Sequence, residues 1–306
     1  MYFLLFLQQF LNGLQAGVML FLMAAGLTLV FGIMDLINLA HGSLFMVGAY
    51  LCATVFQQTG SFFLGLAVAL PGTALVGIAV EIITLRTLYT RDHLDQVLAT
   101  FGLILFFNEL TKIVWGPRAL FLDVPELLSG TVEIIPGAPY PTFRLAIIGV
   151  GILVAIFLYL TVTRTRVGML IRASATNREM VGALGVNVKL LYTLVFGLGA
   201  LLAGLAGAMA GPLIAVEVGM GEDVLILTFV VIVIGGIGSI RGALVGAILV
   251  GLIDNLGRAF LPALFKVFLD PATADGVGSS LASMAIYILM ALVLAWKPRG
   301  LVPAYG

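Results

Sequence analysis

Apolar segments about 20 residues long recur along the whole chain, and this pattern limits the folds that it can adopt. A helix needs about 20 mostly apolar residues to cross the hydrocarbon core of a bilayer. Long unbroken runs such as 145–160 exclude the alternating pattern of a transmembrane β-barrel. Candidate windows lie at 9–31, 36–56, 61–83, 95–114, 144–163, 190–211, 223–240, 242–262 and 281–296.

The composition supports the same interpretation. Of 306 residues, 61% are hydrophobic and 10% are charged, whereas a soluble domain is about 25% charged. A single soluble core cannot hide that much apolar surface, so we exclude a soluble enzyme, a disordered chain and a nucleic-acid-binding protein. Gly or polar residues interrupt several windows. We therefore expect an all-α, polytopic integral membrane bundle, with residues 1–306 as one transmembrane domain of about eight or nine spans, some broken or re-entrant.

The placement of the basic residues predicts an orientation. Short cytoplasmic loops carry an excess of Lys and Arg, and the loop 164–190 is the most basic segment here. It holds Arg164, Arg166, Arg172, Arg178 and Lys189, and other basic residues expected on the same side are Arg86, Arg91, Arg241, Lys297 and Arg299. We expect this loop and the C-terminus in the cytoplasm, and the side of the N-terminus stays open.

The segment 115–143 is the longest one expected outside. Its prolines, which forbid a long helix, are Pro117, Pro125, Pro136, Pro139 and Pro141. It is either a simple connector or a docking surface for an outside partner. Three charged residues near the ends of other windows, Glu81, Glu109 and Lys112, are expected at the membrane interface.

Two apolar windows are followed by broken, polar or glycine-rich segments. The first break holds Asp35, Asn38, His41 and Ser43, and the second holds Gly235, Gly236 and Gly238. The two regions partly align when the chain is shifted by 200 residues, as with 27–30 and 227–230. Paired interruptions in two halves of a membrane protein are typical of a transport pathway. These residues either line or gate such a pathway, or they have structural and interfacial roles, and the alignment itself is also compatible with chance.

The basic loop contains a candidate short helix. Thr176 and Glu179 fit the T-x-x-E capping box, and Gly185 fits a helix stop. Met180, Ala183 and Leu184 share one face. A helix this short is unstable alone in water, so it must be held by neighbouring spans or by a partner. It is either a surface helix on lipid headgroups or an element that transmits force from a partner.

The motifs that catalysis or metal binding would require are missing from the sequence. None of its four lysines ends a P-loop, and its two histidines cannot form an H-E-x-x-H site. Cys52 is the single cysteine. Ser43 and His41 are two apart and would not face each other on a helix. We therefore expect no catalytic residues, no metal site and no cofactor bound by this chain.

Three stretches together resemble one family, the bacterial branched-chain amino acid ABC transporter permeases. They are 26–50 (GLTLVFGIMDLINLAHGSLFMVGAY), 164–188 (RTRVGMLIRASATNREMVGALGVNV) and 235–242 (GGIGSIRG). They occur in the family's order and extend over nearly the whole chain. The short length is similar to that of the smaller permease subunit.

The resemblance implies a complex in the bacterial inner membrane. The partners would be a second permease chain, two ATP-binding cassette subunits that carry ATP and Mg²⁺, and a periplasmic solute-binding protein. It also implies an ATPase coupling helix formed by Thr176, Asn177, Arg178, Glu179, Met180, Ala183, Leu184 and Gly185. The expected substrates are branched-chain or other hydrophobic amino acids, and the family also includes urea and short-chain amide carriers. Two alternatives remain open. One is an ion-coupled secondary transporter, which would need carboxylates in mid-membrane, and the other is a channel or scaffold.

Overall fold

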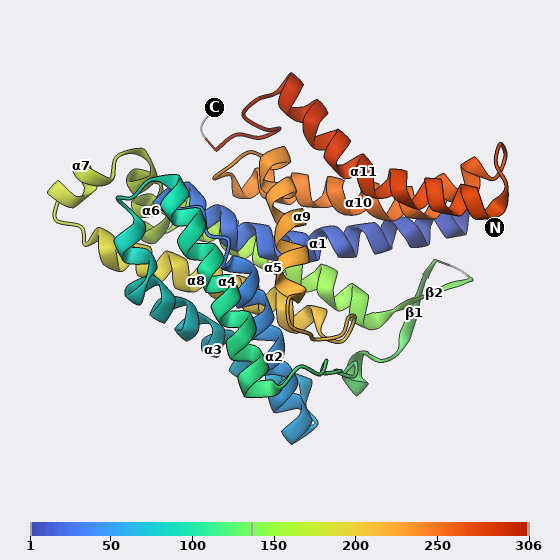
Figure 1. The fold of residues 1–306 in the computed structure, drawn as a ribbon, viewed down its shortest axis with the longest axis horizontal. Coiled ribbons are helices and arrows are strands. Elements are labelled where there is room, and N and C mark those ends of the chain that lie inside the picture. Colours follow the sequence, from blue (N-terminus) through green and yellow to red (C-terminus); the bar gives the residue numbers. More distant parts are fainter. Residues whose placement is uncertain (1, 136, 305–306) are drawn as a thin grey trace. The chain divides into compact units, whose positions relative to one another are not determined.

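The computed structural model describes residues 2–135 and 137–304, and their elements are labelled in Figure 1. Almost all regular structure in these residues is helical. The helices are α1 (Tyr2–Met34), α2 (His41–Thr59), α3 (Phe62–Ile83), α4 (His93–Trp115), α5 (Thr142–Arg164), α6 (Arg166–Thr176), α7 (Arg178–Ala183), α8 (Val188–Ala210), α9 (Met220–Gly235), α10 (Ile240–Phe265) and α11 (Pro271–Trp296). Two 3₁₀ turns, η1 (Leu85–Leu88) and η2 (Glu126–Leu128), and two strands, β1 (Thr131–Ile135) and β2 (Ala138–Pro141), complete the described elements.

Seven of these helices are long and apolar enough to cross a membrane, counted within the described part of the chain: α1, α3, α4, α5, α8, α10 and α11. The helix α2 is 19 residues long but less apolar, and α9 has 16 residues. With these two helices, the structure is consistent with the eight or nine predicted spans. The predicted fold class, an all-α polytopic membrane protein, is confirmed.

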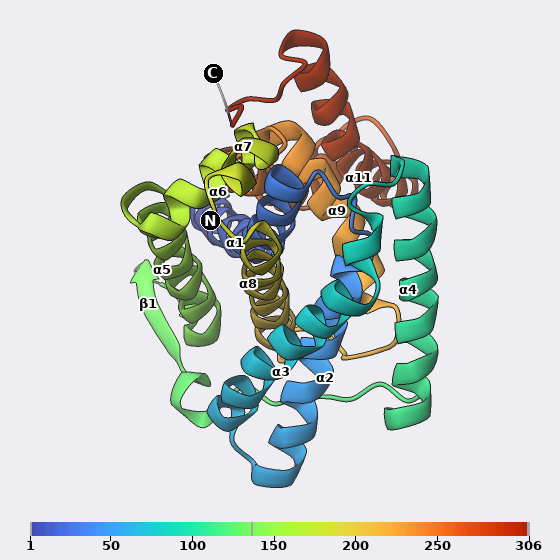
Figure 2. The ribbon, with the colours of Figure 1, turned by 90° about the vertical axis from the view of Figure 1, so that its left-hand side faces the viewer.

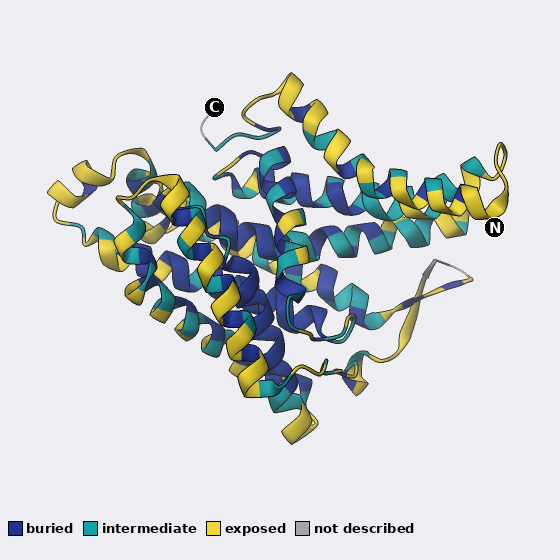
Figure 3. Cartoon of the chain, in the orientation of Figure 1, coloured by how far each residue is buried: buried dark blue, intermediate teal, exposed yellow. Residues whose placement is uncertain are grey.

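Exposed apolar side chains mark the surfaces that face lipid. On α4, Leu98, Phe101 and Leu105 are all more than half exposed within the chain. Figure 3 shows the same contrast along the molecule, with α4 and α7 largely exposed and α8 buried along most of its length. In a bilayer, the exposed apolar side chains of the spanning helices contact hydrocarbon rather than water.

The chain packs as two compact units. The first unit contains 1–21, 126–153 and 228–306, and the second contains 22–125 and 154–227. Parts of α1, α5 and α9 therefore belong to each unit. The basic loop 164–190 lies wholly in the second unit.

In the second unit, α2, α3 and α8 pack against one another (Figure 2). Small residues allow the close approach. A Cβ atom on Gly48 of α2 would lie 2.3 Å from the Cα of Gly204 in α8, and one on Gly77 of α3 would lie 2.4 Å from the Cβ of Ala200. Because lipid tails are as apolar as the helices, close packing of this kind drives helix association in membranes.

In the first unit, the main helix pair is α10 with α11. Again small residues mark the contact, since a Cβ on Gly278 would lie 2.5 Å from the backbone nitrogen of Pro262. The beginning of α1 lies against α10, where a Cβ on Gly13 would lie 3.0 Å from the carbonyl oxygen of Gly251. The packing in this unit therefore follows the same rule.

The segment 115–143 lacks a long helix, as its prolines predict. After α4 ends at Trp115, the chain forms η2 and a hairpin in which β1 and β2 pair antiparallel. This hairpin was not predicted from the sequence. Pro139 and Pro141 lie in β2, and an edge strand tolerates proline because it donates fewer ladder bonds. Pro136 lies outside the described residues.

Candidate functional site

The basic loop folds as two short helices rather than one. The helix α6 begins at an N-cap, Thr165, whose hydroxyl accepts a hydrogen bond from the backbone nitrogen of Gly168 at 3.0 Å. Gly168, Ile171 and Ser174 form its buried side. This helix was missed, although the spacing of those three residues is a helical signal. The loop therefore has a folded base on which α7 rests.

The predicted capping box of α7 is wrong by one residue. Thr176 is the last residue of α6, and its hydroxyl donates back to the carbonyl of Arg172 at 3.0 Å. Asn177 is the N-cap of α7, because its side-chain oxygen accepts from the backbone nitrogen of Met180 at 2.9 Å. Asn and Thr both serve as N-caps, but here Thr176 is still helical, so its hydroxyl is turned to the preceding turn.

The predicted end of α7 is confirmed. Gly185 has φ of 86°, a conformation that favours glycine. Its backbone nitrogen donates to the carbonyl of Gly182 at 3.0 Å, and that of Val186 donates to the carbonyl of Val181 at 3.3 Å. These two bonds form a Schellman motif, so α7 has a defined stop as well as a defined start.

Two apolar side chains at α7 are not covered by the part of the chain that the structure describes. Met180 is 58% exposed and Leu184, its C-cap, is 76% exposed. Ala183 and the charged residues Arg178 and Glu179 are exposed as well. Val181, at 6% exposure, is the residue that anchors the helix to the second unit. The loop thus presents an ordered surface with apolar and charged groups.

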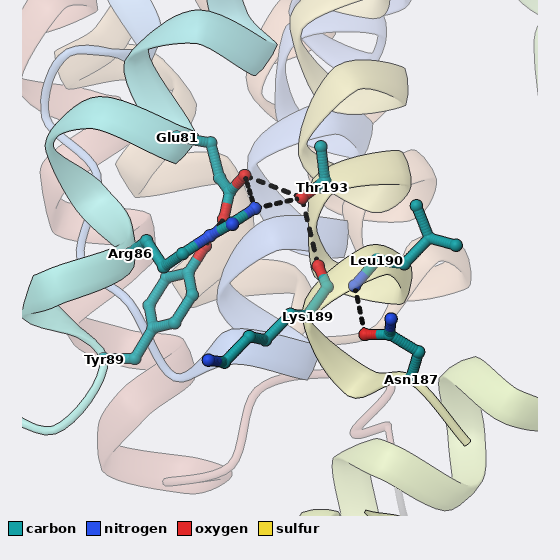
Figure 4. Close-up of polar contacts among 7 residues, drawn as sticks. All are labelled: Glu81, Arg86, Tyr89, Asn187, Lys189, Leu190 and Thr193. Atoms are coloured by element: carbon teal, nitrogen blue, oxygen red, sulfur yellow. Dashed lines mark hydrogen bonds and ion pairs between the residues drawn. The ribbon is translucent and has the colours of Figure 1, made fainter. Parts of the chain in front are cut away.

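A buried carboxylate lies at the end of α3 (Figure 4). The Glu81 side chain is 0% exposed and forms an ion pair with Arg86, at 3.2 Å from Nε and 3.1 Å from Nη2. The hydroxyls of Tyr89 and Thr193 donate to the same carboxylate at 2.6 Å and 2.7 Å. Burial of a charge is costly unless it is paired and hydrogen-bonded, and here both carboxylate oxygens are satisfied. The sequence places Glu81 near a window end but gives no signal of this burial.

Tyr89 and Arg86 extend this cluster. Burial, followed by the hydrogen bond to Glu81, raises the pKa of Tyr89 well above its usual value, so the phenol stays protonated and donates. The hydrogen bond to Glu81 likewise raises the pKa of Arg86. Tyr89 also packs edge to face on Tyr192 of α8, with ring centroids 5.4 Å apart. These contacts join η1 and α8 around the Glu81 carboxylate.

The first predicted break is a real interruption between α1 and α2. Asp35 has φ of 50° and is exposed, and residues 35–40 are not helical. Asn38 and His41 are 0% exposed, and none of their side-chain polar atoms has a hydrogen-bond partner. Ser43, in the first turn of α2, is also buried. The structure brings Asn38, His41 and Ser43 together inside the second unit and turns Asp35 outward.

Two residues of α4 that were not predicted from the sequence hold this break in place. The side-chain oxygen of Gln96 accepts a hydrogen bond from the backbone nitrogen of Ile37 at 3.2 Å. The hydroxyl of Thr100 is 3.5 Å from the carbonyl oxygen of Ile37. Both side chains are buried. Two polar residues four apart in an apolar span were the available signal, because such residues usually face the interior.

The second break, 236–239, separates α9 from α10 and receives the C-terminal tail. The backbone nitrogens of Leu301 and Val302 donate to the carbonyls of Ile234 and Gly235, each at 2.9 Å. A Cβ on Gly236, whose φ is 112°, would lie 3.0 Å from the carbonyl oxygen of Val302. The tail thus caps the end of α9.

The three glycines of this break have local structural reasons. A Cβ on Gly235 would lie 2.2 Å from the carbonyl oxygen of Gly242, and both Gly236 and Gly238 have positive φ. Their role in a transport pathway stays a prediction. Among the described residues, no group of three His, Cys, Asp or Glu side chains lies close enough to hold a metal ion.

The fold and the basic loop 164–190 define the class of protein. It is a multi-pass helical membrane protein whose most basic loop presents a short capped helix. Residues 9–295 match the family model described as the branched-chain amino acid transport system / permease component. The chain belongs to this family.

Individual relatives agree over nearly their full length. The chain is 29% identical to the high-affinity branched-chain amino acid transport system permease protein BraD of Pseudomonas aeruginosa, covering 97% of this chain and 95% of that protein. It is 28% identical to the permease protein LivH of the same kind of system in Escherichia coli, over 95% and 94% of the two chains. The ribose import permease protein RbsC of E. coli is 26% identical over 76% and 73%. No solved structure matches this chain.

Proposed function

We propose that this chain is the permease subunit of an ATP-driven importer for branched-chain or other hydrophobic amino acids. Membership of the permease family and the names of its relatives support the transport role and the substrate class. In this proposal a second permease chain, two ATP-binding subunits and a periplasmic solute-binding protein complete the complex. The ATP-binding subunits carry ATP and Mg²⁺ and perform hydrolysis, and this chain forms the pathway.

The observation that carries this proposal is the exposed surface of α7. Met180 and Leu184 place apolar area in the most basic loop, next to the exposed charges of Arg178 and Glu179. An ordered helix with caps at both ends and an uncovered apolar face fits a protein partner, which would cover the apolar area and pair the charges. We assign this partner as an ATP-binding subunit, and α7 as the coupling helix.

The charges of the loops indicate on which side of the membrane α7 lies. The loop 164–190 and the tail with Lys297 and Arg299 are basic, and cytoplasmic loops carry such an excess. We therefore place α7 and the C-terminus in the cytoplasm, and the protein in the bacterial inner membrane. This is the side on which ATP is available to the partner subunits.

For the pathway we propose the interruption between α1 and α2. A buried Asn or His side chain without a hydrogen-bond partner destabilises the protein. A polar group of the substrate that bonds to Asn38 and His41 would remove this cost. The N-terminus of α2 carries partial positive charge that suits the carboxylate of an amino acid. Ser43 lies in the first turn of α2, and Asp35, which is exposed, is the first residue of the break.

The test is reconstitution of the chain in vesicles with its candidate partner subunits and binding protein. We expect uptake of radiolabelled leucine that requires ATP and stops when the ATP-binding subunits carry an inactivating substitution. Uptake driven by an ion gradient without ATP would overturn the importer assignment. Competition by isoleucine and valine, with urea and acetamide as comparison solutes, would define the substrate class.

A further inference from the structure

The buried carboxylate of Glu81 lies at a helix C-terminus, where a negative charge does not by itself stabilise the fold. Glu81 lies in the last turn of α3, where the helix dipole disfavours a negative charge. Arg86 in η1 compensates this charge with two contacts and is itself 32% exposed at the side chain. A similar apolar side chain would avoid the cost of desolvation. The carboxylate is therefore best explained by the directional contacts that it makes.

Those contacts cross from α3 to α8. The hydroxyl of Thr193 in α8 donates to Glu81 at 2.7 Å and accepts from Nη2 of Arg86 at 2.8 Å. Elsewhere the α3–α8 contact is formed by small residues such as Gly77 against Ala200. Small residues set how closely the two helices approach, whereas hydrogen bonds to a buried charge are directional and strong. Thr193 and Glu81 thus fix the position of α3 along α8.

The start of α8 is in turn joined tightly to α7. Only residues 184–187 separate the two helices, and the Schellman motif at Gly185 orders the first part of this connection. Asn187 orders the second part, because its side-chain oxygen accepts from the backbone nitrogen of Leu190 at 3.0 Å (Figure 4). A displacement of α7 therefore reaches α8 within about two helical turns of Thr193.

We propose that Glu81 and Thr193 are positioning residues that transmit movement of α7 from α8 to α3. This inference rests on the proposed function, in which an ATP-binding subunit moves α7. When α7 and the start of α8 shift, the hydrogen bond and the ion pair make α3 follow. Loss of the link lets α8 slide past α3, so ATP is hydrolysed with less transport.

The most direct variant is Thr193→Val. It keeps the β-branched shape and removes the hydroxyl, while the Glu81 carboxylate keeps Arg86 and Tyr89 as partners. We expect the complex to assemble with a melting temperature lowered by only about 2 °C, because one hydrogen bond is lost. The amount of leucine transported per ATP hydrolysed should fall about fivefold, the equivalent of one typical hydrogen bond. Thr193→Ser restores the hydroxyl and should restore the ratio. Glu81→Gln, which keeps the volume but removes the charge, should lower the ratio as well.

The matched control is Thr59→Val, since the Thr59 hydroxyl donates within its own helix, to the carbonyl of Val55 at 2.7 Å, and is exposed. It should leave the ratio unchanged. A wild-type ratio in both Thr193→Val and Glu81→Gln would overturn the proposed link. An equal loss in Thr193→Val and Thr193→Ser would overturn it too, since the hydroxyl would then be irrelevant. Absence of ATP-driven uptake by the wild-type complex would instead contradict the proposed function itself.

Discussion

The side-chain oxygen of Asn177 lies 2.9 Å from the backbone nitrogen of Met180, and this hydrogen bond begins α7. The neighbouring Thr176 bonds in the opposite direction, to Arg172 in α6. Thr176 thus belongs to the last turn of α6, whereas Asn177 is the N-cap of α7. Their substitutions should therefore have different effects on the loop.

Asn177→Ala should destabilise α7 by about 1 kcal/mol, the usual cost of a lost N-cap. If an ATP-binding subunit docks on α7, the affinity of the complex should fall about fivefold for this loss. The affinity is measured by titrating the purified ATP-binding subunit onto the permease in nanodiscs. Thr176→Val is the matched control and should change the affinity little. A larger effect at Thr176 than at Asn177 would contradict the observed cap.

Gly48→Ala should weaken the second unit, because the added Cβ would lie 2.3 Å from the backbone of Gly204. Overpacking of this kind costs about 1–3 kcal/mol. The measurement is thermal unfolding of the purified protein in detergent. Gly102→Ala in α4 is the control, since a Cβ there meets nothing within 4 Å. Equal melting temperatures for the two variants would show that α2 and α8 are not in close contact.

The substitution Asn38→Leu should raise the stability of the protein and abolish its transport activity. The amide of Asn38 is buried without a partner, and an apolar side chain of similar size removes a cost of about 1–3 kcal/mol. We expect a higher melting temperature together with a loss of ATP-driven leucine uptake. Asn255→Leu is the comparison, because Asn255 donates to the carbonyl of Gly251 at 3.1 Å and its replacement gains nothing. Full uptake by Asn38→Leu would remove Asn38 from the proposed pathway.

The raised pKa of Tyr89 predicts a specific pH behaviour. Folding favours the protonated phenol, so its contribution to stability is complete below the ordinary tyrosine pKa of about 10 and decreases as the pH rises above it. Folded Tyr89 should therefore not ionise between pH 8 and 11. The tyrosinate absorbance of the wild type and of Tyr89→Phe should rise equally over this range. A smaller rise in Tyr89→Phe would mean that Tyr89 titrates normally.

Gly300→Ala should loosen the C-terminal tail. Gly300 has φ of 84°, and an added Cβ would lie 2.4 Å from the Cα of Gly236. The amide hydrogens of Leu301 and Val302, now bonded to α9, should then exchange with solvent at least about fivefold faster, as for the loss of about 1 kcal/mol. Hydrogen exchange read by mass spectrometry tests this. Gly276→Ala, with nothing within 4 Å of the added Cβ, should leave these amides protected.

The helices and their interruptions could be predicted because lipid imposes a length and an apolar composition on each span. The breaks at Asp35 and Gly236 follow from polar and glycine-rich residues between such spans. The stop at Gly185 was predicted for the same reason that it occurs, since a positive φ favours glycine. These features depend on local sequence alone.

The contacts that complete the candidate sites depend on distant residues, and these were not predicted. Glu81 and Thr193 are more than 100 positions apart, and nothing local in either segment indicates the partner. Gln96 reaches the break at Ile37 from another helix. The cap at Asn177 shows a different limit: adjacent Thr and Asn are both good caps, and the length of α6 decided between them.

The tail that caps α9 has a consequence for biosynthesis. The carbonyls of Ile234 and Gly235 are satisfied by Leu301 and Val302, which leave the ribosome only after α10 and α11 have been made. The first unit also combines 1–21 with 228–306, whereas the second is complete once residue 227 has been synthesised. During translation the second unit can therefore fold while the first unit still lacks its C-terminal tail. A ribosome that stalls within α11 leaves the carbonyls at the end of α9 without these hydrogen bonds.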